Sequence, residues 1–178
     1  MSLLRGAVTG QYEAAGPSRI AEADCVIAHS FGTSIFPNSV NGQLGLLAAY
    51  WANVTETPLI ADHVLAEALP AHAPKLAATT EGEIASATGA GLGTWGTFLA
   101  AEEYMAHYNL RNPIIVAQAF HVGRTAVQAV KLDMKPILPP GLPRQFDRDS
   151  DQKHTRYRGA WIPREIIGAV WLKATGKL

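Results

Sequence analysis

A histidine and an arginine stand three residues apart, directly after a short apolar run, and they are the side chains best suited to chemistry. His121 can donate or accept a proton near neutral pH. Arg124 carries a permanent charge on a planar donor group that fits phosphate or carboxylate. We therefore predict an anion site in which His121 is the general acid or base and Arg124 holds the anion. The alternative is that His121 is only hydrogen-bonded locally and that Arg124 is only solvated.

The residues around this pair predict a strand followed by a helix. Residues 114–117 are apolar and too few for a helix of their own, which is typical of a buried parallel strand. Apolar residues then recur at helical spacing from Thr125, so His121 and Arg124 fall on one face of a first helical turn. In open α/β sheets, ligands bind beyond the carboxyl ends of the strands, where a helix N-terminus favours an anion.

Other strand ends bring polar groups to the same edge of the predicted sheet. A strand at 25–28 leads into a loop of small hydroxyl residues, whose backbone N–H groups we expect to hold the anion together with Arg124. A strand at 58–61 ends at Asp62, which is expected chiefly to cap the next helix. Trp95, beside a glycine-rich segment, is placed to stack on a flat base. Thr33 and Asn38 are expected to orient the anion. The predicted ligand-binding residues are His29, Ser30, Gly32, Thr33, Asn38, Asp62, Thr94, Trp95 and Gln118.

Strand and helix patterns alternate along the chain, which predicts an α/β fold: a three-layer, Rossmann-like domain with a mainly parallel sheet of about five strands. The strands are expected at 25–28, 58–61, 75–79, 114–117 and 135–138, in an order that the sequence leaves open. Helices are expected at 42–53 with Asn41 as cap, at 64–69, at 94–107 and at 161–173. Another helix is expected to follow the 114–117 strand and to end at 132. In the last helix we expect Pro163 in the first turn and an inward face of Ile162, Ile166, Ile167, Val170 and Trp171. Residues 1–22 are predicted to be a loosely packed arm, and 23–178 a single domain.

The totals limit the class of protein. The chain has 178 residues, of which 48% are apolar and 17% charged, as in a compact globular domain. Lys plus Arg and Asp plus Glu both total 15, so no general attraction to nucleic acid or to an anionic membrane is expected, and any anion site must be local. Because there is neither an apolar run of about 20 residues nor a signal-peptide pattern, we expect no membrane span and a soluble, cytoplasmic protein. The oligomeric state stays open.

Several kinds of site are not expected. The lone Cys25 lies in an apolar strand, where a buried inert thiol is expected, and a single cysteine excludes a disulfide within the chain. The six histidines show no ligand spacing and have no cysteine partner, so no metal is expected. The sequence also lacks the nucleophile-elbow, Walker and dinucleotide glycine patterns.

Residues 144–158 have charges of alternating sign and no core pattern. Two interpretations stay open: a solvated excursion or a surface that docks a protein partner. Whether His154, Arg156 and Arg158 fold over the site is not decided by the sequence.

Four motifs occur in the order seen in the DUF218 family, the YdcF/SanA/ElyC-like group of bacterial proteins, and the chain resembles that family over roughly residues 22 to 172. They are the ADCVIAHSFGTS strand and loop, Thr94-Trp95 at a helix start, the HxxR of His121 and Arg124, and a W-x-x-R-E of Trp161, Arg164 and Glu165. Some family positions differ here. Only Gly32 remains of a glycine-rich turn, the contact of a helix arginine is either missing or replaced by Gln43, and Glu81 or Glu83 would have to supply an acidic group.

The resemblance implies a protein that binds an anionic small molecule such as a nucleotide or S-adenosylmethionine, with no agreed reaction and with the cofactor unknown. It equally implies an alternative, a hydrolase or transferase for a phosphorylated, polyprenyl-phosphate-like substrate of envelope metabolism. A third expectation is a non-catalytic module that uses the 144–158 loop for protein interaction.

Overall fold

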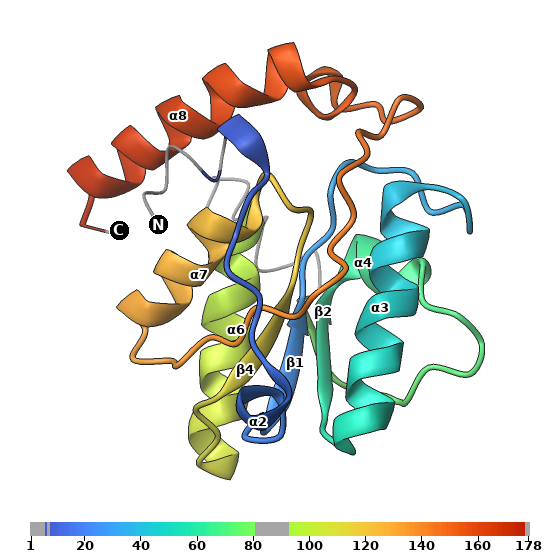
Figure 1. Cartoon of the computed structure of the whole chain (residues 1–178), viewed down its shortest axis with the longest axis vertical. Coiled ribbons are helices and arrows are strands. Elements are labelled where there is room, and N and C mark those ends of the chain that lie inside the picture. The colour runs from blue at the N-terminus through green and yellow to red at the C-terminus, as the bar shows by residue number, and fades with distance from the viewer. Residues whose placement is uncertain (1–5, 7, 81–92, 177–178) are drawn as a thin grey trace.

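The fold is a parallel sheet between two layers of helices, seen in a computed structural model that describes residues 6, 8–80 and 93–176. The strands are β1 (Cys25–Ala28), β2 (Leu59–Asp62), β3 (Leu76–Thr80) and β4 (Pro113–Val116). In Figure 1, α3 (Val40–Thr55) and α4 (His63–Glu67) lie on one side of the sheet, and α6 (Gly93–Tyr108) and α7 (Val122–Lys131) lie on the other. The predicted three-layer, Rossmann-like α/β architecture is confirmed.

The strand order β3-β2-β1-β4 positions the site. The chain adds β2 and β3 on one side of β1 and then returns to pair β4 with its other side, with all pairings parallel. The order therefore reverses between β1 and β4. The segments that leave these two strands turn to opposite faces, and such a switch point is where open α/β sheets bind ligands.

The predicted fifth strand at 135–138 is reduced to one bridge, so the described sheet has four strands rather than about five. Ile137 pairs with Ile114, and its N–H donates to the Pro113 carbonyl at 2.8 Å. Proline lacks the N–H that a ladder needs. Lys135 N still donates to the Arg111 carbonyl at 2.7 Å, but Pro113 has no N–H to return that bond, and Pro139 has none to continue the pairing beyond Ile137.

The starts of two helices test the capping predictions. Asp62 caps α4 as expected, since its Oδ1 accepts from Leu65 N at 2.9 Å. The predicted cap of α3 is wrong, because the helix begins at Val40 and Ser39 Oγ accepts from Gly42 N at 3.1 Å. Asn41 is instead buried and bonded to the loop before the helix.

The last helix, α8 (Arg158–Ala174), begins three residues earlier than predicted, so Pro163 lies inside it rather than in its first turn. Its buried face contains Trp161 and Glu165, which are four residues apart and therefore on one side of the helix. The predicted inward positions of Ile167, Val170 and Trp171 are wrong, because these side chains are exposed, Ile167 by 68%. Figure 1 shows the reason: α8 runs across the top of the molecule, where no layer covers its outer face.

The described part of the N-terminal arm is docked rather than loosely packed. The Tyr12 hydroxyl donates to the Pro139 carbonyl at 2.9 Å and accepts from Leu142 N at 3.1 Å. Ile20, in the short helix α2 (Pro17–Ile20), belongs to the hydrophobic core, as does the buried, free Cys25. None of the helices in the described ranges combines the length and apolar character that a membrane crossing requires.

Candidate functional site

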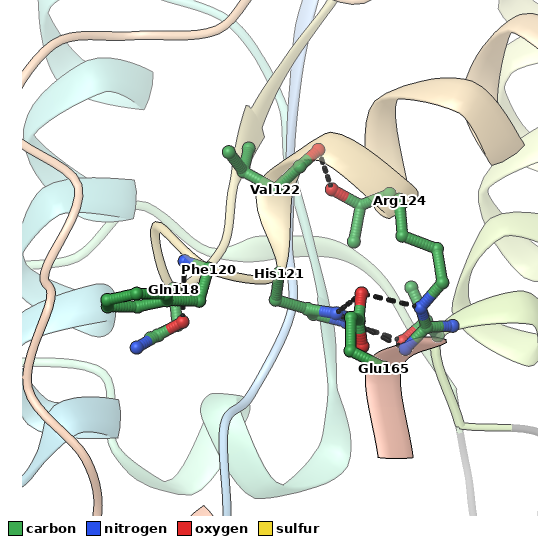
Figure 2. Close-up of polar contacts among 8 residues, drawn as sticks. Gln118, Phe120, His121, Val122, Arg124 and Glu165 are labelled. Carbon is green, nitrogen blue, oxygen red and sulfur yellow. Dashed lines mark hydrogen bonds and ion pairs between the residues drawn. The ribbon is translucent and has the colours of Figure 1, made fainter. Parts of the chain in front are cut away.

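Two segments that are distant in the sequence meet where the strand order reverses. His121 immediately precedes α7, Arg124 lies in the first turn of that helix, and Glu165 comes from the buried face of α8. Figure 2 shows the side chains of His121 and Arg124 pointing toward Glu165. The predicted pair therefore shares one place, together with a carboxylate that the sequence interpretation had not assigned to the site.

The contacts in this cluster form a chain. Arg124 Nε donates to Glu165 Oε1 at 2.8 Å, and the same oxygen lies 3.2 Å from His121 Nδ1. On the other side of the imidazole ring, His121 Nε2 lies 2.9 Å from Thr94 Oγ1, at the start of α6. Thr94 thus joins the cluster, as predicted for the ligand site. Its hydroxyl, an imidazole and a carboxylate stand in series.

The carboxylate determines which nitrogen of His121 carries the proton. An ionised carboxylate can only accept, so Nδ1 donates to Glu165 and Nε2 presents its lone pair to the Thr94 hydroxyl. Arg124 Nη2 also lies 3.2 Å from His121 Nδ1 and donates to it in the other tautomer, in which Nε2 carries the proton and donates to Thr94 Oγ1. We assign the proton to Nδ1 because this tautomer satisfies the ionised Glu165 oxygen, which can only accept.

The electrostatics agree with this assignment. Burial, followed by the Arg124 charge, lowers the pKa of His121 below its ordinary value, although Glu165 opposes this shift. Burial opposes ionisation of Glu165, but His121 and Arg124 outweigh it and hold the pKa of the carboxyl below its usual value. At neutral pH the cluster therefore contains a neutral imidazole between a hydroxyl and an anion, the protonation state that a general base needs.

His29 follows β1 and lies at the same edge of the sheet. Its side chain is 1% exposed and packs against Phe98 at a ring distance of 4.6 Å. Burial, and then the charges of His121 and Arg124, lower the pKa of His29 well below its ordinary value, so the ring is neutral. Neither of its nitrogens has a hydrogen-bond partner among the described residues. Buried polar groups are rarely left unpaired without a functional reason or a bound molecule.

The loop after β1 does not offer its N–H groups as expected. The N–H groups of Ser30 and Phe31 donate to Asp62 Oδ2 and Asn41 Oδ1, both at 2.7 Å. Those of Thr33 and Ser34 donate to Ser150 Oγ and Asp147 Oδ2, both at 3.1 Å. These four donors are occupied within the chain, so the prediction that they hold the anion is wrong.

The 144–158 segment supplies two of those acceptors. Its Asp147, Ser150 and Thr155 are buried, which a solvated excursion would not show. Gly32 permits the contact, since a Cβ on it would stand 2.4 Å from Asp147 Oδ2. Further along, His154 stacks on Trp161 at 5.9 Å, and Trp161 meets the His121 ring edge-on at 5.3 Å. The 144–158 segment therefore holds the loop after β1 by hydrogen bonds and covers the Trp161 indole, which lies against His121.

Other residues that were predicted to bind the ligand form hydrogen bonds within the chain or lie elsewhere in the fold. Gln118 is buried, with Oε1 accepting from Phe120 N at 2.8 Å and Nε2 donating to the Gln145 carbonyl at 3.1 Å. Thr33 Oγ1 accepts from Asp151 N at 3.0 Å. Asn38 is exposed on the loop before α3, and Trp95 is half-buried on α6. Thr33 and Asn38 are therefore not positioned to orient an anion at His121.

Two residues that the sequence interpretation did not assign to the site are Glu165 and Trp161. Both belong to the W-x-x-R-E motif, and their spacing of four, with one charged and one aromatic member, was the available signal. Gln43 lines an open depression on the outer side of α3 with Leu46, Tyr50 and Gly141, away from the cluster. Glu81 and Glu83 lie outside the described residues.

Within residues 6, 8–80 and 93–176, no three histidine, cysteine, aspartate or glutamate side chains are grouped as metal ligands. Comparison with protein-family models, with curated proteins and with solved structures finds no match to this chain.

Proposed function

We propose that this protein binds a small molecule with an anionic group, such as a nucleotide or S-adenosylmethionine, at the carboxyl edge of its sheet between β1 and β4. The observation that carries the proposal is the position of the His121, Arg124 and Glu165 cluster at the switch point of the strand order. The resemblance to the DUF218 family supports it, because all three residues belong to the motifs on which that resemblance rests.

The charges near the cluster favour an anion. The charges that act on His121 are those of Arg124, Arg164 and Glu165, and Arg124 pairs with the Glu165 carboxylate. With His121 and His29 neutral, these three groups leave one positive charge beside His121, whereas the Asp62 and Asp147 carboxylates at the same edge accept from backbone N–H groups. The Arg124 side chain is 17% exposed, so it is reachable from solvent. A dry, positively charged edge attracts and orients an anionic ligand.

Calorimetric titration tests this proposal with ATP, AMP, S-adenosylmethionine and inorganic phosphate. Arg124→Gln should weaken binding about 10- to 100-fold, because a charge-assisted hydrogen bond contributes about 1.5–3 kcal/mol. Arg111→Gln is the matched control, since Arg111 is an exposed arginine just before β4, at the amino edge of the sheet. Arg124→Lys keeps the charge that Glu165 needs and separates a folding defect from a lost contact. Equal affinity in the Arg124→Gln and Arg111→Gln proteins, or no binding of any of these ligands, would contradict the proposal.

A second candidate is a hydrolase or transferase that acts on a phosphorylated substrate, of the kind that the envelope-linked family members suggest. The observation that favours it is the contact of a neutral imidazole with a hydroxyl, at 2.9 Å between His121 Nε2 and Thr94 Oγ1. Binding alone does not require a hydroxyl held by a buried base. Release of p-nitrophenolate from p-nitrophenyl phosphate tests this candidate, and His121→Gln should lower the rate by about 100-fold or more.

A further inference from the structure

We propose that Thr94 is the nucleophile of this site, that His121 is its general base, and that the transferred group is the phosphoryl group of a phosphate ester. This inference rests on the second proposed function and names the atom that attacks. Glu165 is the positioning residue, because it acts through His121.

The first support is the direction of the hydrogen bonds. Glu165 Oε1 fixes the proton on His121 Nδ1, so the bare Nε2 accepts the Thr94 hydroxyl proton at 2.9 Å between the heavy atoms. A weakly acidic hydroxyl becomes a nucleophile when an adjacent base takes its proton, and the base is itself oriented by a third group. Thr94, His121 and Glu165 stand in this relationship.

The second support is that Thr94 differs from two other helical threonines, Thr55 and Thr125. Thr55 Oγ1 donates to the Trp51 carbonyl at 2.7 Å, and Thr125 Oγ1 donates to the Val122 carbonyl at 2.8 Å. Such bonds to the preceding turn are the usual way for a helix to satisfy a threonine hydroxyl. Thr94 is the second residue of α6, so no helical carbonyl lies one turn before it, and its hydroxyl turns to the imidazole instead.

The third support is an unpaired polar group that can serve the phosphoryl oxygens. His29 is almost fully buried, and both of its nitrogens lack partners among the described residues. His29 packs on Phe98, which lies one turn after Thr94 on the same face of α6. Its imidazole is therefore close to the hydroxyl and can donate to a phosphoryl oxygen.

The charges select a phosphate ester over a neutral ester. Arg124 and Arg164 both act on His121, the base that contacts the hydroxyl, and positive charge there stabilises the oxygens of a phosphoryl group during transfer. A neutral acyl group would gain little from that charge before its carbonyl is attacked.

The reaction balances with water as the only co-reactant. Thr94 Oγ forms a bond to phosphorus, the bond from phosphorus to the alcohol oxygen breaks, and the Thr94 proton passes to His121 Nε2 and then to the departing alkoxide. The chain now carries a phosphothreonine. His121 next takes a proton from water, the water oxygen attacks phosphorus, the bond to Thr94 Oγ breaks, and His121 returns the proton to Thr94.

The test uses the full chain with p-nitrophenyl phosphate, acid quenching and intact-mass measurement. The wild-type chain should gain the mass of one HPO3 group, and peptide sequencing should locate that group on Thr94. Thr94→Val should abolish the adduct and lower turnover by about 100-fold or more, whereas Thr94→Ser should restore both. Thr55→Val is the matched control, because it removes the hydroxyl of a helical threonine far from the cluster.

The outcomes separate this inference from anion binding. Binding of inorganic phosphate to the wild-type chain is measured beside turnover of the ester. Phosphate binding without turnover, turnover without an adduct, or an adduct that survives in Thr94→Val would each overturn the nucleophile assignment and leave the binding proposal standing. A wild-type chain that neither binds phosphate nor turns over the ester would overturn both.

Glu165→Gln tests the positioning role. The Glu165 charge raises the pKa of His121, so its removal should lower that pKa further and move the acid limb of the kcat/KM profile to lower pH. A residue that is needed only for folding would lower activity without moving this limb. An unchanged acid limb would overturn the role of Glu165.

Discussion

Replacing Gly32 with alanine tests whether the 144–158 segment holds the loop after β1. Gly32 has a φ of +85°, and a Cβ built on it would stand 2.4 Å from Asp147 Oδ2 and 2.8 Å from Ser150 Oγ. Both distances are shorter than any tolerated contact, so the two acceptors would have to withdraw. They would then lose the bonds that they accept from Ser34 N and Thr33 N.

The magnitude follows from these contacts. A left-handed conformation costs a residue with a Cβ about 1–2 kcal/mol. Each buried N–H group that loses its acceptor adds about 1–3 kcal/mol. The free energy of unfolding should therefore fall by about 3–8 kcal/mol in Gly32→Ala when strain and both hydrogen bonds are lost.

Gly141→Ala provides the matched control. Gly141 has nearly the same φ, +83°, but a Cβ there would meet no described atom within 4 Å. It should lose only the strain of about 1–2 kcal/mol. Urea unfolding followed by tryptophan fluorescence measures both variants, and an unchanged m-value keeps the comparison valid. Equal destabilisation of the two variants would refute the clamp between Gly32 and the 144–158 segment.

Three further predictions concern the rest of the molecule. Burial, and then the neighbouring Asp24 carboxyl, raise the pKa of the Cys25 thiol, so it should not react with a disulfide reagent at pH 8 until urea unfolds the chain; fast native labelling would contradict its burial. Because the pKa of buried His29 lies well below its ordinary value, the unfolded chain binds more protons below about pH 6.5, and this group should cost about 1.4 kcal/mol of stability per pH unit on acidification. Urea unfolding at pH values from about 7.5 to about 5.5, which bracket the ordinary histidine pKa, measures this cost. The free energy of unfolding should change less steeply with pH in His29→Gln than in wild type or in the exposed His72→Gln, and identical slopes in all three would contradict the prediction. Asp24→Ala should lose about 1–3 kcal/mol, because Asp24 accepts from Asn112 N at 2.9 Å; urea unfolding measures the loss, and a change below the error of the method would contradict the contact.

The elements that the sequence predicted well are those with a local cause. Strand β1 has its predicted bounds, Cys25–Ala28, because a strand buried on both faces must be a continuous apolar run. The Asp62 cap was also predictable from nearby residues, because a helix start needs a hydrogen-bond acceptor within a few residues. His121 and Arg124 were brought together by their spacing on one helical turn.

What the sequence did not predict depends on residues that are far apart. The outward face of α8 has helical periodicity, but periodicity does not tell whether another layer covers that face, as the exposed Ile167 shows. Glu165 is buried because Arg124, 41 residues earlier, pairs with it. Asp147 and Ser150 come from a segment without any apolar pattern, so their bonds to the loop after β1 left no local signal.

The origin of Glu165 in α8 has a consequence for synthesis of the chain. Translation proceeds from the N-terminus, so His121 and Arg124 emerge from the ribosome before their carboxylate partner, which follows 41 residues after Arg124. Until α8 has emerged and docked, a nascent chain has its sheet but an uncompensated guanidinium and an imidazole without a fixed tautomer. The cluster of His121, Arg124 and Glu165 is therefore completed only when α8 has docked.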